Sequence, residues 1–401
     1  MNAAARSYLE RTVRSWIGVP AGVDYPVPEL PEPLARLLLR VEEYELAYRG
    51  QWGCWEFGQS ENFRRGALWT CEVDRWIVER RAEAAATLDL VPLWPDASPF
   101  AVCLTHDVDF VSHQVTPAQV MRSLQTAPHA AGVAARLARA VAGGVRRAPA
   151  MTEALERCVA IEREYGVSAS YFFTVFPETG SDRVDCVYLP GDRCTFEGRP
   201  TTVAGVMRSL AAEGFDVGLH GSYNSATVPG MLGRQRQVLE DALGAEVTTT
   251  RQHFLHWDVR ITPGLQEEAG LAADSTLGFN RNVGFRAGTS LPFHHFDLDA
   301  GRELRLLEVP LVVHDGPLLR ADGLELDTEG AIAVVRQLFR EVEACGGVAT
   351  LLFHPNSLAR DEFQVVYRAA LEHARERGAW ITSLRGVSDW WVERESRLSA
   401  S

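Results

Sequence analysis

Acidic and basic side chains recur in this sequence directly after short apolar runs that are typical of β-strands. The first run, residues 100–105, leads through His106 into Asp107 and Asp109. Further polar residues of this kind end later apolar runs: His220, Arg251, His253, Asp315 and His354. Carboxylate and imidazole groups bind divalent metal ions and transfer protons. The pattern therefore indicates a hydrolytic site, on the condition that the fold brings these strand ends together.

One residue separates Asp107 from Asp109, so both carboxylates are expected to lie close together at the end of the strand. One carboxylate can bind a cation, and the cation keeps the other one ionised as a proton acceptor. Taken alone, the sequence D-V-D is more typical of a capping loop. The other polar residues are in isolation equally typical of hydrogen-bonded strand ends, a helix cap or a surface ion pair: His220, His354, Asn224 and Arg251. It is their joint presence that favours catalysis.

Helices and strands alternate regularly from residue 151 onward. Helical periodicity is found at residues 151–165, 201–213, 230–243, 263–269, 329–345 and 361–377. Strands are predicted at residues 169–175, 215–220, 247–251, 271–274, 304–313, 348–354 and 380–383. Alternating strands and helices imply a parallel sheet, and seven or eight such units fit a (β/α) barrel. In a barrel the carboxyl ends of the strands face one mouth, which would gather the polar residues in one place.

The chain divides into an N-terminal region, residues 1–97, and a barrel over residues 98–401. The N-terminal region is proline-rich at residues 20–33, helical in pattern at residues 34–48 and rich in tryptophan after residue 50, which predicts a mainly helical cap or extension. Most of its tryptophans are expected to fill a core, and one or two to narrow access to the barrel mouth. An alanine- and arginine-rich stretch at about residues 112–150 is expected to be a helical insertion.

Composition excludes several classes of function. The net charge is −13, so nucleic acid and anionic membranes are not expected as partners. The sequence contains no lysine, which rules out Schiff-base chemistry and a Walker-type phosphate loop. There is no apolar run of 18 residues and no apolar segment typical of a signal peptide near the start. Seven widely spaced cysteines without a C-x-x-C pair predict reduced thiols, and we expect a cytoplasmic protein.

In chain order, five segments resemble motifs of the NodB-homology polysaccharide deacetylases, carbohydrate esterase family 4. T-H-D-V-D at residues 105–109 is similar to the T-F-D-D motif, and G-V-S-A-S-Y-F-F-T at 166–174 to G-x-x-A-T-F-F. V-G-L-H-G-S-Y-N at 217–224 stands where the family has H-x-x-x-H, R-Q-H-F at 251–254 where it has R-x-P-Y, and L-L-F-H-P at 351–355 resembles the closing L-x-H motif. The resemblance covers roughly residues 98–390 and implies a distorted (β/α) barrel of a divergent bacterial branch.

The resemblance also implies roles for individual residues. Asp107 would be the general base, held by Arg251, and His354 would protonate the leaving amine, with Asp315 as a looser match for the group that orients it. Asp109 and His220 would bind a divalent metal ion, for which zinc fits best and cobalt or nickel would also fit. A backbone N–H near Phe254 would help to hold the oxyanion. The expected substrate contacts are His253, Phe254, Tyr223 and Arg286.

Three departures from the family pattern bear on the metal site. Asn224 replaces the second histidine of H-x-x-x-H, so the third metal ligand could be Asn224, His253 or water. His253 stands in place of the proline of R-x-P-Y. The adjacent carboxylates of the family are here separated by one residue, which leaves the assignments of base and ligand between Asp107 and Asp109 interchangeable.

The resemblance implies a metal-dependent hydrolase that removes an N-acyl group, with N-acetyl expected, from an amino sugar or a sugar-bearing metabolite. Because no secretion signal is found, a small molecule or glycoconjugate is favoured over a cell-wall polymer. One alternative is a metal-weak deformylase or cyclic-amide hydrolase of the same superfamily. Another is a catalytically degenerate carbohydrate-binding barrel, although such a module would not need Asp107, Arg251 and His354 together.

Overall fold

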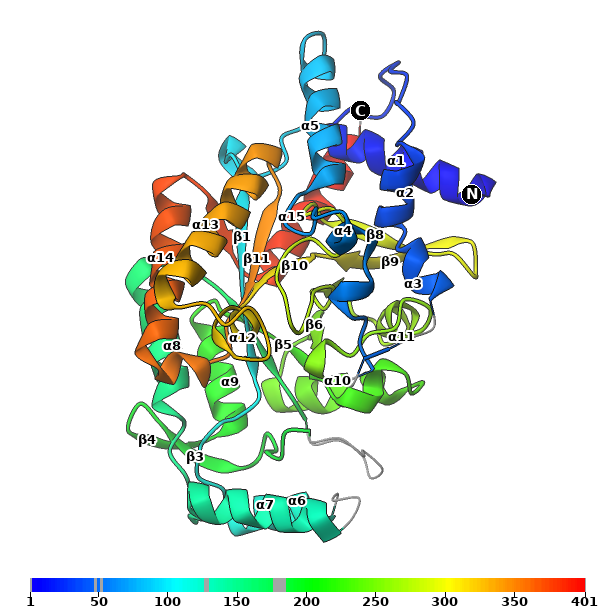
Figure 1. Cartoon of the computed structure of the whole chain (residues 1–401). Helices are drawn as coiled ribbons and strands as arrows, with labels where there is room; N and C mark the ends of the chain where they lie inside the picture. Colours follow the sequence, from blue (N-terminus) through cyan, green and yellow to red (C-terminus); the bar gives the residue numbers. More distant parts are fainter. Residues whose placement is uncertain (1, 47–48, 51–52, 126–129, 176–184, 401) are drawn as a thin grey trace.

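The computed structural model describes residues 2–46, 49–50, 53–125, 130–175 and 185–400 of the chain. Its centre is a curved sheet with the strand order β10-β11-β1-β2-β5-β6-β7-β9-β8, in which β12 pairs with β1 (Figure 1). Neighbouring strands of this sheet are parallel except for β8 and β9. The strands are β1 Ala101–Val108, β2 Ser170–Phe173, β5 Asp216–Gly221, β6 Thr249–Gln252, β7 Ala273–Asp274, β8 Phe293–Asp297, β9 Arg302–Glu308, β10 Leu311–His314, β11 Val348–Leu352 and β12 Trp380–Thr382.

The sheet is curved because a link of two residues joins β9, next to one end of the strand order, to β10 at the other end. β9 pairs with β7, whereas β10 pairs with β11, and only Val309 and Pro310 separate β9 from β10. A link of this length spans only a few ångströms, so the two sides of the sheet must approach each other. Within the described ranges, no ladder joins β10 to β8 or β9. The result is the distorted (β/α) barrel that the sequence predicts.

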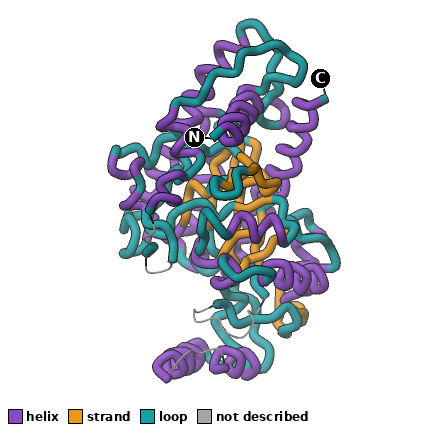
Figure 2. Tube along the Cα trace, turned by 90° about the vertical axis from the view of Figure 1, so that its right-hand side faces the viewer, coloured by secondary structure: helices purple, strands orange, loops and turns teal. Residues whose placement is uncertain are grey.

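Helices cover the outside of the curved sheet, and Figure 2 shows the strands enclosed by them. The bounds of α13 illustrate how the sequence sets a helix: the side chain of Asp327 accepts the N–H of Gly330 at the start, and Gly346 takes up left-handed backbone with φ 66° at the end. The α-helices from residue 151 onward are α8 Glu153–Tyr165, α9 Val203–Ala212, α10 Met231–Leu243, α11 Thr262–Glu268, α12 Asp315–Leu319, α13 Thr328–Cys345, α14 Asp361–Glu376 and α15 Leu384–Ser399.

The two faces of β1 contribute to two different hydrophobic cores. All eight residues of β1 are buried, as is usual for a parallel strand that is covered on both sides. Val102 and Leu104 pack with the outer helices, whereas Ala101 and Cys103 pack with the N-terminal region and α15. The N-terminal region therefore shares a core with the barrel.

Most of the N-terminal region lies near the amino ends of the strands, where Figure 1 shows α1 and α5 above the sheet. Trp94 Nε1 donates to the carbonyl of Gly346, just before β11, and Trp94 is buried. Residues 53–69 lie instead near the carboxyl ends of the strands. Cys54 Sγ is 3.2 Å from the carbonyl oxygen of Phe254, which follows β6. The elements of this region are α1 Ala3–Ile17, α2 Glu32–Leu38, α3 Val41–Glu45, η1 Phe57–Gln59, α4 Glu61–Arg64, α5 Glu72–Ala85 and η2 Pro95–Ala97.

The stretch predicted as a helical insertion forms two helices, α6 Pro117–Gln125 and α7 Ala130–Gly143. They lie at the foot of the molecule in Figures 1 and 2, away from the N-terminal region. A hairpin of β3 Arg193–Phe196 and β4 Arg199–Thr202 lies beside them, and Gln119 of α6 donates to Asp192 at 2.9 Å. These helices extend the barrel beyond the carboxyl ends of its strands.

Three sequence predictions need correction. The single strand predicted at residues 304–313 is two strands, because Pro310 has no N–H to donate to a ladder. The helix predicted at 34–48 is broken between α2 and α3, where Arg40 adopts left-handed backbone with φ 58°; residues 47–48 lie outside the described ranges. The hairpin β3–β4, strand β8 and helix α15 were not predicted at all. None of the described helices has both the length and the apolar character needed to cross a membrane.

Candidate active site

The carboxyl ends of four parallel strands bring the predicted site residues to one mouth. Asp107 belongs to β1 and Asp109 follows it, His220 belongs to β5, and Arg251 belongs to β6. His253 lies in the short helix η4 His253–Leu255 after β6, and His354 follows β11. Residues that are far apart in the chain therefore surround one small volume.

Asp109 is the centre of this arrangement. Its Oδ1 lies 3.3 Å from His220 Nε2 and 3.7 Å from His253 Nε2, and its Oδ2 lies 3.7 Å from His354 Nε2. Burial alone would raise the pKa of Asp109, but the close contact with His220 and the charges of the surrounding histidines outweigh it and hold the pKa below its usual value. The carboxylate is therefore ionised and faces three imidazoles.

Each of the two histidines that face Asp109 Oδ1 is oriented by a hydrogen bond at its other ring nitrogen. His220 donates through Nδ1 to the carbonyl oxygen of Arg251 at 3.0 Å, and His253 donates through Nδ1 to Asp185 Oδ1 at 3.0 Å. In each ring this turns Nε2 towards Asp109. Histidine ligands of metal ions are commonly held in this way, with the second ring nitrogen bound to a carbonyl or carboxylate.

The buried atoms of the site fit a divalent metal ion. His220 Nε2 is buried and makes no hydrogen bond to any residue of the described ranges. A buried imidazole nitrogen without a partner carries a free-energy cost, which a bound cation would remove. Ligand atoms of Asp109, His253 and Cys186 lie within 4.8 Å of one another, at a spacing that a single ion could bridge.

Asp107 is the second carboxylate of the site and lies deeper. Its Oδ2 is 3.9 Å from His220 Nε2, and its Oδ1 is 3.9 Å from Arg251 Nη1. Arg251 is buried and fixed, because its Nη2 donates to Thr105 Oγ1 and Ser275 Oγ at 2.9 and 3.0 Å. Asp109 is thus nearer to the histidines than Asp107, which stands beside a fixed cation.

His354, which faces the other carboxylate oxygen of Asp109, is held in place by Asp315. The backbone N–H and Nδ1 of His354 both donate to the Asp315 carboxylate, each at 2.9 Å. Burial alone would lower the pKa of His354, but the charge of Asp315 and its hydrogen bond outweigh it and raise the pKa to about 9. The imidazole is therefore a proton donor at neutral pH.

The turn after β6 carries strained backbone at the site. Phe254 and Leu255 have backbone φ angles of 60° and 49°, which residues other than glycine rarely adopt. The carbonyl of Phe254 is held in place by Asn280 Nδ2 at 2.6 Å and by Cys54 Sγ at 3.2 Å. Strain of this kind persists where surrounding contacts fix it, and it is frequent at functional sites.

The structure does not bring Arg286 to the mouth, so its predicted substrate contact is wrong. Arg286 is 2% exposed, and its Nε and Nη2 donate to the two carboxylate oxygens of Glu43 in α3 at 2.9 and 2.8 Å. Its guanidinium also lies over the ring of Trp257. This arginine holds the N-terminal region to the barrel.

Tyr223 and Asn224 lie in a short helix, η3 Tyr223–Ala226, after β5. The buried Tyr223 ring stacks on His256 with centroids 4.0 Å apart, and it lies edge-on to Phe254. Asn224 is half-buried, and its backbone carbonyl accepts the N–H of Val228 at 3.0 Å. Of the two candidate side chains for the third metal ligand, His253 is the one that faces Asp109, with its Nε2 3.7 Å from Oδ1.

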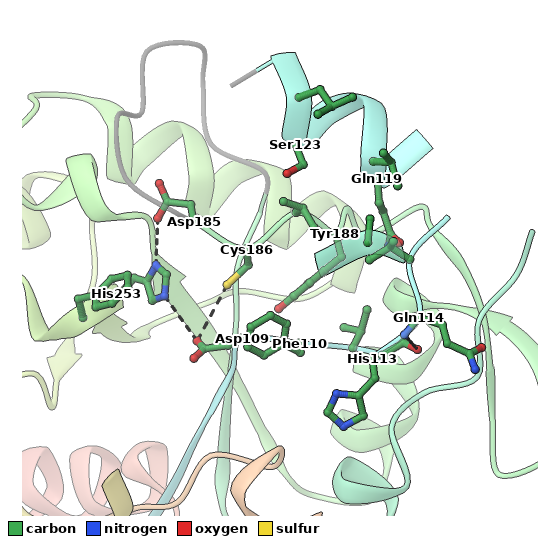
Figure 3. A pocket seen from close by; sticks show the side chains of 18 residues that line it. Asp109, Phe110, His113, Gln114, Gln119, Ser123, Asp185, Cys186, Tyr188 and His253 are labelled. Atoms are coloured by element: carbon green, nitrogen blue, oxygen red, sulfur yellow. Dashed lines mark hydrogen bonds and ion pairs between the residues drawn. The ribbon is translucent and has the colours of Figure 1, made fainter. Parts of the chain in front are cut away.

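Two residues of the site had no signal in the sequence. Asp185 accepts from His253 and from the N–H of Tyr223 at 2.8 Å, and Cys186 Sγ lies 4.0 Å from Asp109 Oδ1. Both lie in a stretch without helix or strand pattern, so nothing in the sequence connects them with strand ends far away in the chain. Figure 3 shows both around Asp109 and His253, at the edge of a cavity of about 510 Å³.

Solved structures similar to this chain are found, although no protein-family model and no curated protein matches its sequence. A Mycobacterium smegmatis protein assigned to the polysaccharide deacetylases is 19% identical, with a TM-score of 0.51 over 77% of this chain and 96% of that chain. Puue allantoinase is 14% identical, with a TM-score of 0.47 over 77% and 95%. A protein of Pseudomonas aeruginosa PAO1, also assigned to the polysaccharide deacetylases, is 14% identical, with a TM-score of 0.45 over 77% and 95%.

The likeness to the Mycobacterium smegmatis structure confirms the predicted fold class. At 19% identity it extends to the fold alone. The resemblance found in the sequence motifs thus holds at the level of the fold.

Proposed function

We propose that this protein is a metal-dependent hydrolase that cleaves an N-acyl amide bond, with an amino sugar or a sugar-bearing small molecule as the amine component. The observation that carries the proposal is the position of Asp109. Its carboxylate is faced by His220 and His253 on one oxygen and by His354 on the other, with Asp107 beside them. A metal-ligand set, a base and an acid thus meet at one mouth.

Asp109, His220 and His253 would hold the metal ion. A set of two imidazole nitrogens and one carboxylate oxygen suits Zn²⁺, and Co²⁺ or Ni²⁺ would also fit. When bound, such an ion polarises a carbonyl group and makes water a better nucleophile at neutral pH. Asp185 supports this set, because it fixes the His253 ring in the orientation that points Nε2 at Asp109.

Asp107 is the residue that would accept the proton of the attacking water. Its carboxylate is buried, and the fixed guanidinium of Arg251 lies 3.9 Å from its Oδ1. The water oxygen joins the acyl carbon, and the C–N bond then breaks. His354, kept protonated by Asp315, would give its proton to the departing amine nitrogen, so that a carboxylate and an amine are formed.

The experiment that tests the proposal combines metal analysis with an amide-cleavage assay. The purified protein should bind one equivalent of Zn²⁺, lose it to a chelator, and release amine from N-acylglucosamines only in the metal-loaded form. His220→Ala should abolish metal retention and leave the circular dichroism spectrum unchanged. A protein that binds no divalent ion would overturn the proposal. A metal-loaded protein that cleaves only formamides or cyclic amides would instead be a deformylase or a cyclic-amide hydrolase.

A further inference from the structure

A cavity opens from the candidate metal site towards the insertion helices. It has a volume of about 510 Å³ and extends from Asp109 and His253 to α6 and α7 (Figure 3). Pockets of 300–1,000 Å³ hold most of a drug-sized ligand. An acetyl methyl group is about as large as a water molecule, whose share of liquid volume is about 30 Å³. The cavity is therefore far larger than an acetyl group needs.

The two ends of the cavity differ in chemistry. Polar groups gather at the metal end, where Asp109, Asp185, Cys186 and His253 line it. Away from that end the wall is mainly apolar, with Phe110, Val115, Val120, Leu124, Ala140 and Val187.

Two of the larger polar side chains on the wall, Gln119 and Tyr188, are engaged with the protein, whereas His113 is exposed and Gln114 is half-buried. Gln119 accepts the N–H of Thr116 and donates to Asp192, and the Tyr188 hydroxyl donates to the carbonyl of Val108. A sugar ring needs hydrogen-bonding partners for its hydroxyl groups, whereas an alkyl or aryl group needs none. The apolar part of the wall therefore suits an apolar group better than a sugar.

The position of the proton donor indicates which half of the substrate enters the cavity. His354 contacts Asp109 Oδ2 and is not among the lining residues, whereas His253 contacts Oδ1 and lines the cavity. The departing amine must lie within reach of His354. The other substituent of the reacting carbon, the acyl chain, then extends to the opposite side, where the cavity opens.

We infer that this cavity binds the acyl group and that the preferred substrate carries a long or bulky apolar acyl chain in place of acetyl. The inference rests on the proposed function and makes it more specific. Half of the residues that line the cavity belong to the insertion at residues 112–150, so the insertion contributes to chain-length preference. Phe110, whose side chain is 50% exposed beside the cavity, gains an apolar partner when the chain binds.

The test is a series of N-acylglucosamines with acetyl, butanoyl, hexanoyl and octanoyl chains, assayed with the Zn²⁺-loaded protein. A fully buried methylene changes affinity about fourfold, so kcat/KM should rise by about 10²-fold or more from acetyl to octanoyl. A binding measurement without turnover accompanies it. Octanohydroxamic acid should bind more tightly than acetohydroxamic acid by a similar factor in titration calorimetry.

Two neighbouring positions on α7 provide a matched pair of variants. Ala140 lines the cavity, whereas Val141 is 76% exposed and is not among the lining residues. Ala140→Trp should reduce the octanoyl-to-acetyl ratio of kcat/KM by about 10-fold or more, because the indole occupies space that the chain needs. Val141→Trp should leave the ratio as in the wild type. If Ala140→Trp folds poorly, Val120→Phe narrows the same cavity from α6.

The outcomes separate the inference from the proposed function. Cleavage that is equal or faster for acetyl than for octanoyl would overturn the inference and leave the amide hydrolase in place. An equal decrease of the octanoyl-to-acetyl ratio of kcat/KM in Ala140→Trp and Val141→Trp would also overturn the inference. A metal-loaded protein that cleaves no member of the series would overturn the proposed function, and the inference with it.

Discussion

His253 and Asp185 form a hydrogen bond of 3.0 Å between Nδ1 and Oδ1, which leaves His253 Nε2 3.7 Å from the carboxylate of Asp109. In the proposed metal site, His253 would be the third donor beside Asp109 and His220. It would act from the turn after β6, whereas the H-x-x-x-H motif that residues 217–224 resemble has its second histidine four residues after the first. The following predictions depend on this arrangement.

Removing His253 should weaken metal binding more than removing Asn224. His253→Ala should lower Zn²⁺ affinity by about 10²-fold or more, since a direct ligand is lost. Asp185→Asn should lower it by about 10- to 100-fold, because the ring loses the carboxylate that orients it. Competition with a fluorescent zinc chelator measures both. Asn224→Ala is the matched control, and loss of zinc in this variant with retention in His253→Ala would reverse the assignment.

Asp107→Asn should abolish turnover while the protein keeps its metal. The amide has the size of the carboxylate but cannot accept a proton, so kcat should fall by about 10²-fold or more. Asp109→Asn should instead reduce the bound metal. Asp241→Asn on α10, an exposed position, serves as the control for the substitution type. Metal loss in Asp107→Asn and retention in Asp109→Asn would mean that the two roles are exchanged.

Asp315→Asn should narrow the pH range of activity on its alkaline side. A general acid works only while protonated, so the rate is present below the pKa of His354 and is lost as pH rises through about 9. Without the negative charge of Asp315 this pKa falls towards its ordinary value, and the alkaline limb should move down by about one to two pH units. A pH profile of kcat measures the change. Asp322→Asn should leave the profile unchanged, and an unshifted limb in Asp315→Asn would contradict the role of His354.

Arg286→Met should destabilise the protein without affecting its metal. The substitution leaves the Glu43 carboxylate buried beside Arg40 with half of its charge partners gone, at a cost of about 3–5 kcal/mol in the free energy of unfolding. Denaturant unfolding of the metal-free protein measures this cost. Arg260→Met, which breaks the exposed pair with Asp299, should cost less than about 1 kcal/mol. Loss of zinc in a folded Arg286→Met would contradict the structural role.

Local patterns in the sequence predicted most helices and strands of the barrel, and the positions of residues at strand ends predicted most of the candidate site. The helix expected at 329–345 is α13 to within one residue, because Asp327 and Gly346 cap it. Asp107, Asp109, His220 and His354 could be grouped because parallel strands end at one edge.

What could not be predicted depends on contacts between distant parts of the chain. Asp185 has no periodic element around it, so its contact with His253, 68 residues away, appears only in three dimensions. Arg286 pairs with Glu43 across 243 residues, and a glycine-flanked arginine looks the same in sequence whether it faces a substrate or a buried carboxylate. The wall of the cavity likewise depends on how α6 and α7 pack against the end of β1.

The two-residue link at Val309 and Pro310 has a consequence for the order in which the barrel forms. The pairing of β10 with β11 and the pairing of β9 with β7 are coupled, since the link holds β9 and β10 close together. β1 and β11 themselves meet across 246 residues, as the hydrogen bond from Thr105 to Leu351 shows. Contacts so distant in sequence form slowly, because the intervening chain must first lose its freedom. Asp315 and His354, which follow β10 and β11, should therefore reach the mouth late in folding, so that the acid of the site assembles after the strands that carry Asp109 and His220 have paired through β2.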